Sequence, residues 1–166
     1  MCAPKFFLTD VAHALRVTPA WENLRVSFEN DLADAESRVR GAVFHHFSAR
    51  ARKTKFLVVL NHTWPPYDGL VVYAFTTTNT GHFAAAGVPE ETIVRLNPGD
   101  YSFVTAPTVI DLTRPEIEQL SAIVSAPSYK FVAQLRLQDV KAIDDAVRAS
   151  TVIVRKVKRM ILADYG

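Results

Sequence analysis

Apolar residues recur at three- and four-residue steps in the first part of the chain, and strand-like segments follow them. Between Trp21 and Val39 the apolar positions form one helical stripe, which Gly41 ends. Residues 42–109 are rich in Val, Phe, Tyr and Thr and are interrupted by turn residues, which favours β-strands. The pattern therefore predicts a helical N-terminal part over residues 1–40 and a mostly antiparallel sheet after it.

After Gly41, apolar segments of strand length predict a series of β-strands. The expected strands are Val43–Phe47, Phe56–Leu60, Leu70–Phe75, Thr92–Leu96, Tyr101–Thr105, Val109–Leu112 and Tyr129–Leu135. Loops are expected at 61–69, where consecutive prolines cannot sustain a central ladder, and at 79–91. Helices are expected from Thr113 to about Ile123, over Gln138–Ser150, and as a basic amphipathic segment within 151–166. The sum is an α+β fold, a small antiparallel β-barrel over 41–150 with helices before and after it.

Composition narrows the class of protein further. With 166 residues, 49% of them hydrophobic and 22% charged, we expect one folded core with appendages and not a disordered chain. The lone Cys2 excludes an intramolecular disulfide, and no metal-ligand spacing stands out, so no metal and no cofactor are expected. No apolar run approaches the roughly 18 residues of a membrane span. The apolar patch near the N-terminus is also too short for a secretory signal, so we expect a cytoplasmic protein without a membrane partner.

Positive charge gathers between the first two expected strands. Residues 38–55 carry six cations and no acids, whereas residues 22–36 carry five acids and one cation. The third expected strand ends in three threonines, Thr76–Thr78. Strand ends that deliver cations and hydroxyls suit a polyanion, because phosphate oxygens need both charge and hydrogen-bond donors. We therefore expect a phosphate-binding surface within 41–78; the alternative is a solvated loop beside a polar strand end.

Five stretches carry a resemblance to a known family. They are a glycine and an apolar strand at 41–44, a lysine-headed strand at 55–60, a strand ending in threonines at 70–77, the later strands within 101–112, and a closing strand and helix at 132–147. In this order they resemble the MazF/PemK family of toxin endoribonucleases, over roughly residues 41–150. The resemblance implies an SH3-like barrel that forms a homodimer, cleaves single-stranded RNA without a metal, and is neutralised by a cognate antitoxin protein.

The resemblance also implies roles for individual residues. The family's arginine at the head of the second strand falls on Lys55, the proline after it falls on Phe56, and the strand-ending threonine falls on Thr76. Lysine keeps the positive charge but lacks the planar fork with which arginine grips a phosphate. The expected catalytic residues are Lys55, Arg52 and Thr76, with the cations stabilising the phosphorane and the hydroxyl binding a phosphate oxygen. The expected RNA-binding residues are Arg50, Lys53, Thr77, Trp64, Tyr67 and His62.

Imidazole and aromatic side chains extend this candidate site. His45 and His46 are neighbours on a strand and face opposite sides, so two-histidine catalysis would combine one of them with His62 or His82; a surface or core role is the alternative. Three aromatic residues in expected loops either stack on unpaired bases or pin their loops to the barrel. They are Trp64, Tyr67 and Phe83.

Three functions stay open at this point. The leading hypothesis is the endoribonuclease toxin of a type II toxin–antitoxin system. Because Lys55 and Phe56 replace the family's arginine and proline, the second is a non-catalytic barrel that binds nucleic acid or a protein partner. Residues 8–21 also resemble a helix-turn-helix DNA reader, but Glu22 and Glu29 would repel phosphate. We therefore expect residues 1–40 to be a helical appendage.

Overall fold

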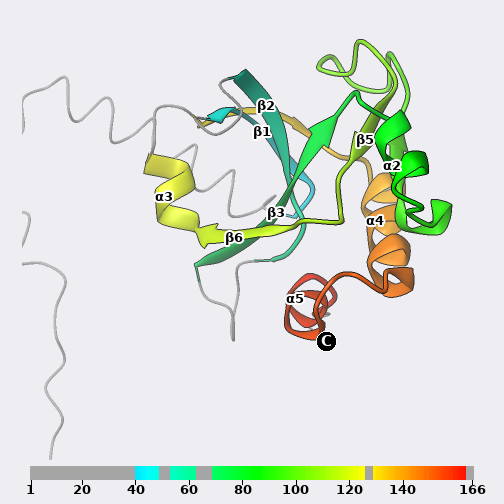
Figure 1. The fold of residues 1–166 in the computed structure, drawn as a ribbon. Helices are drawn as coiled ribbons and strands as arrows, with labels where there is room; N and C mark the ends of the chain where they lie inside the picture. The colour runs from blue at the N-terminus through cyan, green and yellow to red at the C-terminus, as the bar shows by residue number, and fades with distance from the viewer. Residues whose placement is uncertain (1–39, 49–52, 63–68, 126–128, 164–166) are drawn as a thin grey trace, which may run out of the picture. The chain divides into compact units, whose positions relative to one another are not determined.

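The computed structural model describes residues 40–48, 53–62, 69–125 and 129–163, and these form a curled antiparallel sheet with helices on both of its faces (Figure 1). The expected helices within 1–39 lie outside the described residues, and so do Arg50, Arg52, Trp64 and Tyr67. In the part of the chain that is described, no helix is long and apolar enough to cross a membrane.

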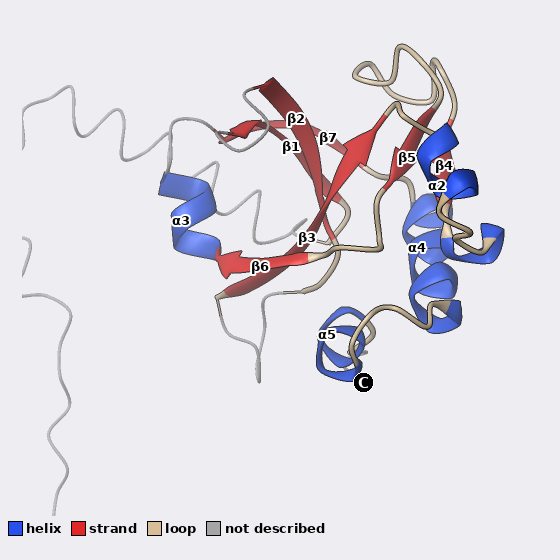
Figure 2. Ribbon diagram, in the orientation of Figure 1, coloured by secondary structure: helices blue, strands red, loops and turns tan. Residues whose placement is uncertain are grey.

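Seven strands make up the sheet of the described residues, in the order β4-β5-β3-β2-β1-β7, with β6 paired to β3 beside this path (Figure 2). All of the pairings are antiparallel. The strands are β1 (Ala42–Ser48), β2 (Lys53–Val59), β3 (Leu70–Thr77), β4 (Val94–Leu96), β5 (Thr108–Ile110), β6 (Glu116–Gln119) and β7 (Tyr129–Gln134). The α+β class and the antiparallel sheet expected from the sequence are thereby confirmed, and the sheet is curled into a half-barrel.

Short helices connect and follow the strands. They are α2 (Gly81–Ala85), the 3-10 helix η1 (Glu90–Thr92), α3 (Leu120–Ser125), α4 (Leu137–Ala149) and α5 (Arg155–Ile161). Helix α4 has the apolar face that its sequence predicts, because Ile143, Ala146 and Val147 are buried while its other residues are more exposed. The stretch expected as a plain loop, 79–91, instead contains α2 and the start of η1.

Two other expected elements are wrong, one of them only in part. Residues 101–105 form a turn and not a strand: the Val104 amide donates to the Tyr101 carbonyl (2.9 Å), and the Gly99 amide donates to the Val104 carbonyl (3.1 Å). The Tyr101 hydroxyl bonds Asp139 on α4, which holds the turn against that helix. The helix expected from Thr113 to Ile123 is wrong in its first part, where residues 116–119 form strand β6, whereas residues 120–123 belong to helix α3. Pairing with the open edge of β3 overrides the local helix signal there.

Side-chain alternation along the strands builds an apolar cluster on each face of the sheet. The larger cluster joins β-strand residues to α4 and α5, and we call this side the α4 face; its buried members include Val58, Val72, Ala74, Ile143, Val147, Met160 and Ile161. The smaller cluster defines the α3 face and consists of Ala42, Phe44, Leu57, Val59, Val71, Tyr73 and Ile123. Because α5 contributes to the α4-face cluster, the described part of the basic C-terminal segment shares the core of the sheet. Full burial of one such side chain stabilises the fold by about 1.5–3 kcal/mol.

Two residues hold β1, β2 and β3 together at one end. Gly41 has φ +82° and approaches α4 closely, since a Cβ atom there would lie 2.8 Å from Val140 Cγ2. The Asn61 side chain is fully buried; its Nδ2 donates to the Leu70 carbonyl (2.9 Å), and its Oδ1 accepts from the Val72 amide (2.7 Å). These contacts fix the strands at this end and leave the opposite ends of β2 and β3 to diverge.

Candidate functional site

Strands β2 and β3 separate toward Lys53 and Thr77. Their paired positions run from Val59 with Tyr73 to Leu57 with Phe75. Beyond this point β2 stays paired with β1 as far as Lys53, whereas β3 pairs with β5 through Thr76 and Thr77. Beyond Leu57 and Phe75, β2 therefore stays with β1 and β3 stays with β5, and a cavity opens between β2 and β3.

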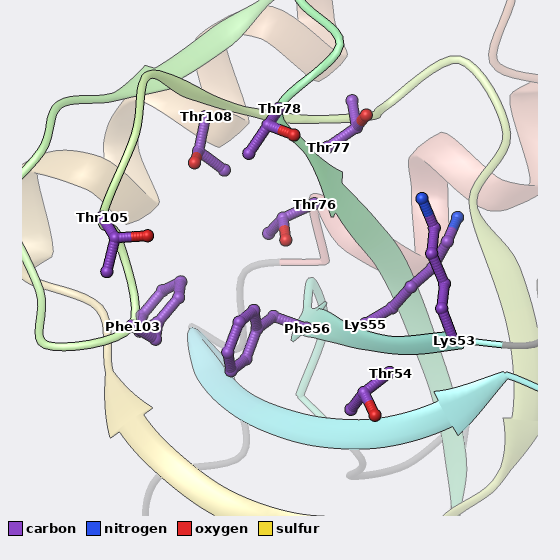
Figure 3. Close-up of a pocket in the computed structure, with 10 residues that line it drawn as sticks. All are labelled: Lys53, Thr54, Lys55, Phe56, Thr76, Thr77, Thr78, Phe103, Thr105 and Thr108. Atoms are coloured by element: carbon purple, nitrogen blue, oxygen red, sulfur yellow. The ribbon is translucent and has the colours of Figure 1, made fainter.

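The cavity between the two strands has a volume of about 210 Å³ and is lined by cations, hydroxyls and two aromatic rings. Its lining residues are Lys53, Thr54, Lys55, Phe56, Thr76, Thr77, Thr78, Phe103, Thr105 and Thr108. Figure 3 shows both lysine side chains extending from β2 on the same side, while Phe56 points the other way, toward Phe103. The cavity therefore has a cationic wall, an aromatic wall and several hydroxyls between them.

The cationic wall carries positive charge that the described residues do not neutralise. In the described ranges, no carboxylate forms an ion pair with Lys53 or Lys55. Lys53 is exposed and Lys55 is half-buried, with its Nζ 5.0 Å from the centroid of the Phe75 ring. A cation over an aromatic face gains a modest attraction and is held in place without losing its charge. Both ammonium groups are thus able to bind an anion.

The hydroxyls of the cavity differ in how they are bonded. Thr108 is buried and donates to the Ala106 carbonyl (2.8 Å), and the Thr77 hydroxyl accepts from the Asn79 amide (3.1 Å). Thr76 is only 8% exposed as a residue, but its hydroxyl, which bonds no residue that the structure describes, is not among the buried unpaired side-chain atoms. Because Thr76 also lines the cavity, its hydroxyl is well placed to bond a ligand.

The aromatic wall is part of a row of rings that continues behind the cavity. Phe56 and Phe103 have ring centroids 4.9 Å apart with planes at 43°, His45 lies 5.0 Å behind Phe56, and Tyr101 lies 5.5 Å from Phe103. Burial and the bond to Asp139 raise the pKa of Tyr101. Phe103 is thus packed between Tyr101 and Phe56 where it lines the cavity.

The residues expected from the sequence are distributed over two places. Lys53, Lys55, Thr76 and Thr77 all line the cavity between β2 and β3. His62 instead lines a second cavity of about 510 Å³ with Arg40, Gln134 and Asp144, beside α4, and is not among the residues that line the first. Trp64, Tyr67, Arg50 and Arg52 lie outside the described residues, so the structure does not place them.

Alternation separates the cavity residues further. Lys55 lies over Phe75, which packs on the α3 face, whereas Phe56 packs on the α4 face. Since successive side chains of a strand point to opposite faces, Lys53, Lys55 and Thr77 belong to the α3 face and Thr76 to the α4 face. The lysine ammonium groups and the Thr76 hydroxyl thus approach a ligand in the cavity from two sides.

Sequence reasoning missed the part of the lining that comes from distant segments. Phe103, Thr105 and Thr108 reach the cavity from the turn after β4 and from β5. Nothing local in the sequence marks them, because their place depends on the pairing of β5 with the end of β3. Thr54, in contrast, sits between two lysines already assigned to the site, and its spacing along β2 was the available signal.

A second group of polar side chains lies on the α3 face. The Tyr73 hydroxyl donates to Glu116 Oε2 (2.9 Å) and to Glu118 Oε2 (3.4 Å), and the Tyr129 hydroxyl donates to Glu118 Oε2 (3.4 Å). Burial, followed by the hydrogen bond to Glu116, raises the pKa of Tyr73 far above its usual value of 10.0. Burial and the Glu118 charge raise the pKa of Tyr129 to about 12. Across the described residues, no group of three or more His, Cys, Asp or Glu side chains is placed to hold a metal ion.

A scan against protein-family models and a search of curated proteins each found no match for this chain. A function for the protein is therefore inferred from the cavity between β2 and β3 and from the residues around it.

Proposed function

We propose that this protein binds single-stranded RNA at the cavity between β2 and β3 and cleaves it, as a toxin endoribonuclease of the MazF/PemK type. The observation that carries the proposal is the convergence of Lys53, Lys55 and Thr76 on one cavity, with no described carboxylate paired to either lysine. In this proposal the curled sheet is the SH3-like barrel of that family, the protein acts as a cytoplasmic homodimer, and a cognate antitoxin neutralises it.

The chemistry of the cavity suits an unpaired nucleic-acid strand. Two ammonium groups suit a phosphate, and the Thr76 hydroxyl adds a neutral donor beside them. The Phe56 and Phe103 rings line the same cavity and add an aromatic surface that one unpaired base can contact. A cavity of about 210 Å³ suits a single base with its phosphate at the cationic wall.

Cleavage at this site would follow the usual course of a metal-independent ribonuclease. The 2′-oxygen of the bound nucleotide attacks phosphorus, the bond to the 5′-oxygen breaks, and the products carry a 2′,3′-cyclic phosphate and a 5′-hydroxyl. Lys55 would stabilise the extra negative charge of the phosphorane, and Thr76 would donate to a non-bridging oxygen. Lys53 would hold the neighbouring phosphate.

A second candidate function is RNA binding without cleavage. The described lining of the cavity contains neither an imidazole nor a carboxylate, the groups that most often move protons near neutral pH. In this case the same lysines and aromatic rings bind a single RNA strand, or an acidic protein segment, and release it uncleaved.

The test is to incubate the purified full chain with labelled single-stranded RNA of mixed sequence and with the matching duplex. We expect cleavage of the single strand, with much slower cleavage by the Lys55→Ala and Thr76→Val variants and normal cleavage by Lys156→Ala, which removes an exposed lysine of α5. Expression without an antitoxin is expected to arrest growth. Binding without cleavage or growth arrest would favour the second candidate, and absence of binding would reject both.

A further inference from the structure

His46 lies directly opposite Lys55 in the antiparallel pairing of β1 with β2. Residues directly opposite each other in such a pair project to the same face, with Cβ atoms about 4.5–5.5 Å apart. His46 therefore shares the α3 face with Lys55. Its neighbour His45 packs against Phe56 on the other face, with ring centroids 5.0 Å apart.

Packing holds the His46 ring in one orientation. The ring stacks on Tyr129 of β7, with centroids 4.0 Å apart and planes within 7° of each other. The Tyr129 hydroxyl is in turn bonded to Glu118 of β6 (3.4 Å), so three strands fix the ring. The residue as a whole is half-buried, which leaves part of it accessible.

One ring nitrogen of His46 is buried without a partner. Nδ1 has no hydrogen bond to any residue that the structure describes. A buried polar atom without a partner costs free energy, and a catalytic role is one of the explanations for such atoms in native proteins. The other ring nitrogen, Nε2, is not among the buried unpaired side-chain atoms of the described residues, so it is the nitrogen available to a ligand.

We propose that His46 is the residue that takes the proton from the 2′-hydroxyl when RNA is cleaved beside Lys55. This inference rests on the proposed function, and it supplies the proton acceptor that the described lining of the cavity lacks. Imidazole is the side chain that most often exchanges protons near neutral pH. The described charged groups around the ring are Lys55 of β2 and, through Tyr129, Glu118 of β6.

In this step the proton of the RNA passes to His46 and then to water. Nε2 of neutral His46 accepts the proton of the 2′-hydroxyl while the 2′-oxygen bonds to phosphorus and the Lys55 ammonium faces the non-bridging oxygens. The bond from phosphorus to the 5′-oxygen breaks, and that oxygen takes a proton from a water molecule. The hydroxide so formed recovers the proton from the His46 imidazolium, so neither an oxidant nor a metal is required.

The experiment compares His46→Ala with Lys156→Ala, which removes an exposed side chain of α5 that does not line the cavity. The cleavage rate of a single-stranded RNA is measured for both, and binding is measured with a 2′-O-methyl RNA that cannot be cleaved. We expect His46→Ala to lower the rate about 100-fold or more, the usual size of a general-base effect. Binding should stay within about threefold, as should the cleavage rate of Lys156→Ala.

Two readouts separate proton transfer from a structural role. Imidazole added to the His46→Ala variant is expected to restore part of the cleavage rate, because it can enter the space of the missing ring. The pH profile of the wild-type protein should contain a limb in which the cleavage rate rises with pH, as a general base requires. This limb should be absent from His46→Gln, a variant that keeps a polar side chain of similar size and guards against a folding defect.

The outcomes distinguish this inference from the proposed function. If the wild-type protein cleaves RNA and both His46→Ala and His46→Gln cleave it as fast as the wild type, only the role of His46 is overturned. The same holds if imidazole restores nothing to a folded His46→Ala variant. If the wild-type protein binds RNA without cleaving it, both the role of His46 and the endoribonuclease activity are overturned. If it does not bind RNA, the proposed function as a whole is overturned.

Discussion

The ammonium group of Lys55 lies 5.0 Å from the centroid of the Phe75 ring, on the strand beside its own. Phe75 is the last residue of β3 that pairs with β2, opposite Leu57, whereas Lys55 lies two residues beyond Leu57, where the cavity opens. Because Phe75 and Thr76 are successive residues of β3, the Thr76 side chain points to the other face of the sheet. A phosphate held by Lys55 therefore meets Thr76 only where the strands have already separated.

Replacing Lys55 with arginine is expected to strengthen RNA binding. Arginine keeps the charge, stacks on an aromatic face such as that of Phe75, and offers two parallel donors to one phosphate. The gain should be about 1 kcal/mol, or roughly fivefold in affinity for single-stranded RNA, measured by fluorescence anisotropy at fixed salt. Lys55→Gln is the matched control and should bind more weakly than wild type. Equal affinities for the arginine and glutamine variants would show that Lys55 does not contact phosphate.

Thr76→Val should impair RNA binding or cleavage without destabilising the protein. Its hydroxyl has no partner among the described residues, and valine has nearly the same shape, so the free energy of unfolding should change by less than about 1 kcal/mol. Thr108→Val is the control, because it removes the bond to the Ala106 carbonyl (2.8 Å) from an equally buried threonine. That change should cost about 1 kcal/mol or more in urea unfolding. A large loss of stability in Thr76→Val alone would assign Thr76 to the core.

Tyr129 should make stability depend on alkaline pH. Its pKa is raised from 10.0 to about 12 in the folded protein, since burial and the Glu118 charge disfavour the phenolate. A raised pKa stabilises the fold below the unfolded value of 10.0, and this contribution is lost as the pH rises toward about 12. The urea midpoint of the wild-type protein should therefore fall between pH 10 and pH 12 more than that of Tyr129→Phe, which keeps the ring under His46. Parallel curves for the two proteins would contradict this assignment.

Gly41→Ala should be one of the most damaging single changes in the described part of the chain. Gly41 has φ +82°, and an added Cβ would lie 2.8 Å from Val140 Cγ2 and 2.9 Å from Gln134 Nε2. Backbone strain costs about 1–2 kcal/mol at such a φ, and overpacking adds about 1–3 kcal/mol. Gly99→Ala separates the two effects, because Gly99 has φ +87° but no atom within 4 Å of the added Cβ. Similar losses of stability in the two variants would show that β1 and α4 move apart easily.

The first three strands, β7 and α4 could be predicted from the sequence because their apolar patterns are local. Val43, Leu57 and Val72 lie where strand-length runs of Val, Leu and Phe place them. The segment around Glu116 could not be predicted, since it becomes a strand only by pairing with β3. Likewise, residues 101–105 have strand-like composition but are bent into a turn by the contact of Tyr101 with Asp139 on α4.

Part of the candidate site could also be predicted from the sequence. Lys55 and Thr76 stand at strand ends, and strand ends can be recognised in a sequence. The divergence of β2 from β3 could not be, because it depends on which strand each of them pairs with next. For the same reason the sequence placed His45 and His46 on opposite faces but did not show that His46 faces Lys55.

The central claim, that the cavity between β2 and β3 holds single-stranded RNA through its two lysines, is tested most directly by the salt dependence of binding. The affinity of the full chain for labelled single-stranded RNA is measured over a series of salt concentrations, for the wild type and for the Lys53→Ala/Lys55→Ala double variant. Each phosphate contact to a single strand contributes about 0.7 to the slope of log affinity against log salt, so the double variant should have a slope shallower by about 1.4 and a lower affinity. An unchanged slope and affinity in the double variant would contradict the claim.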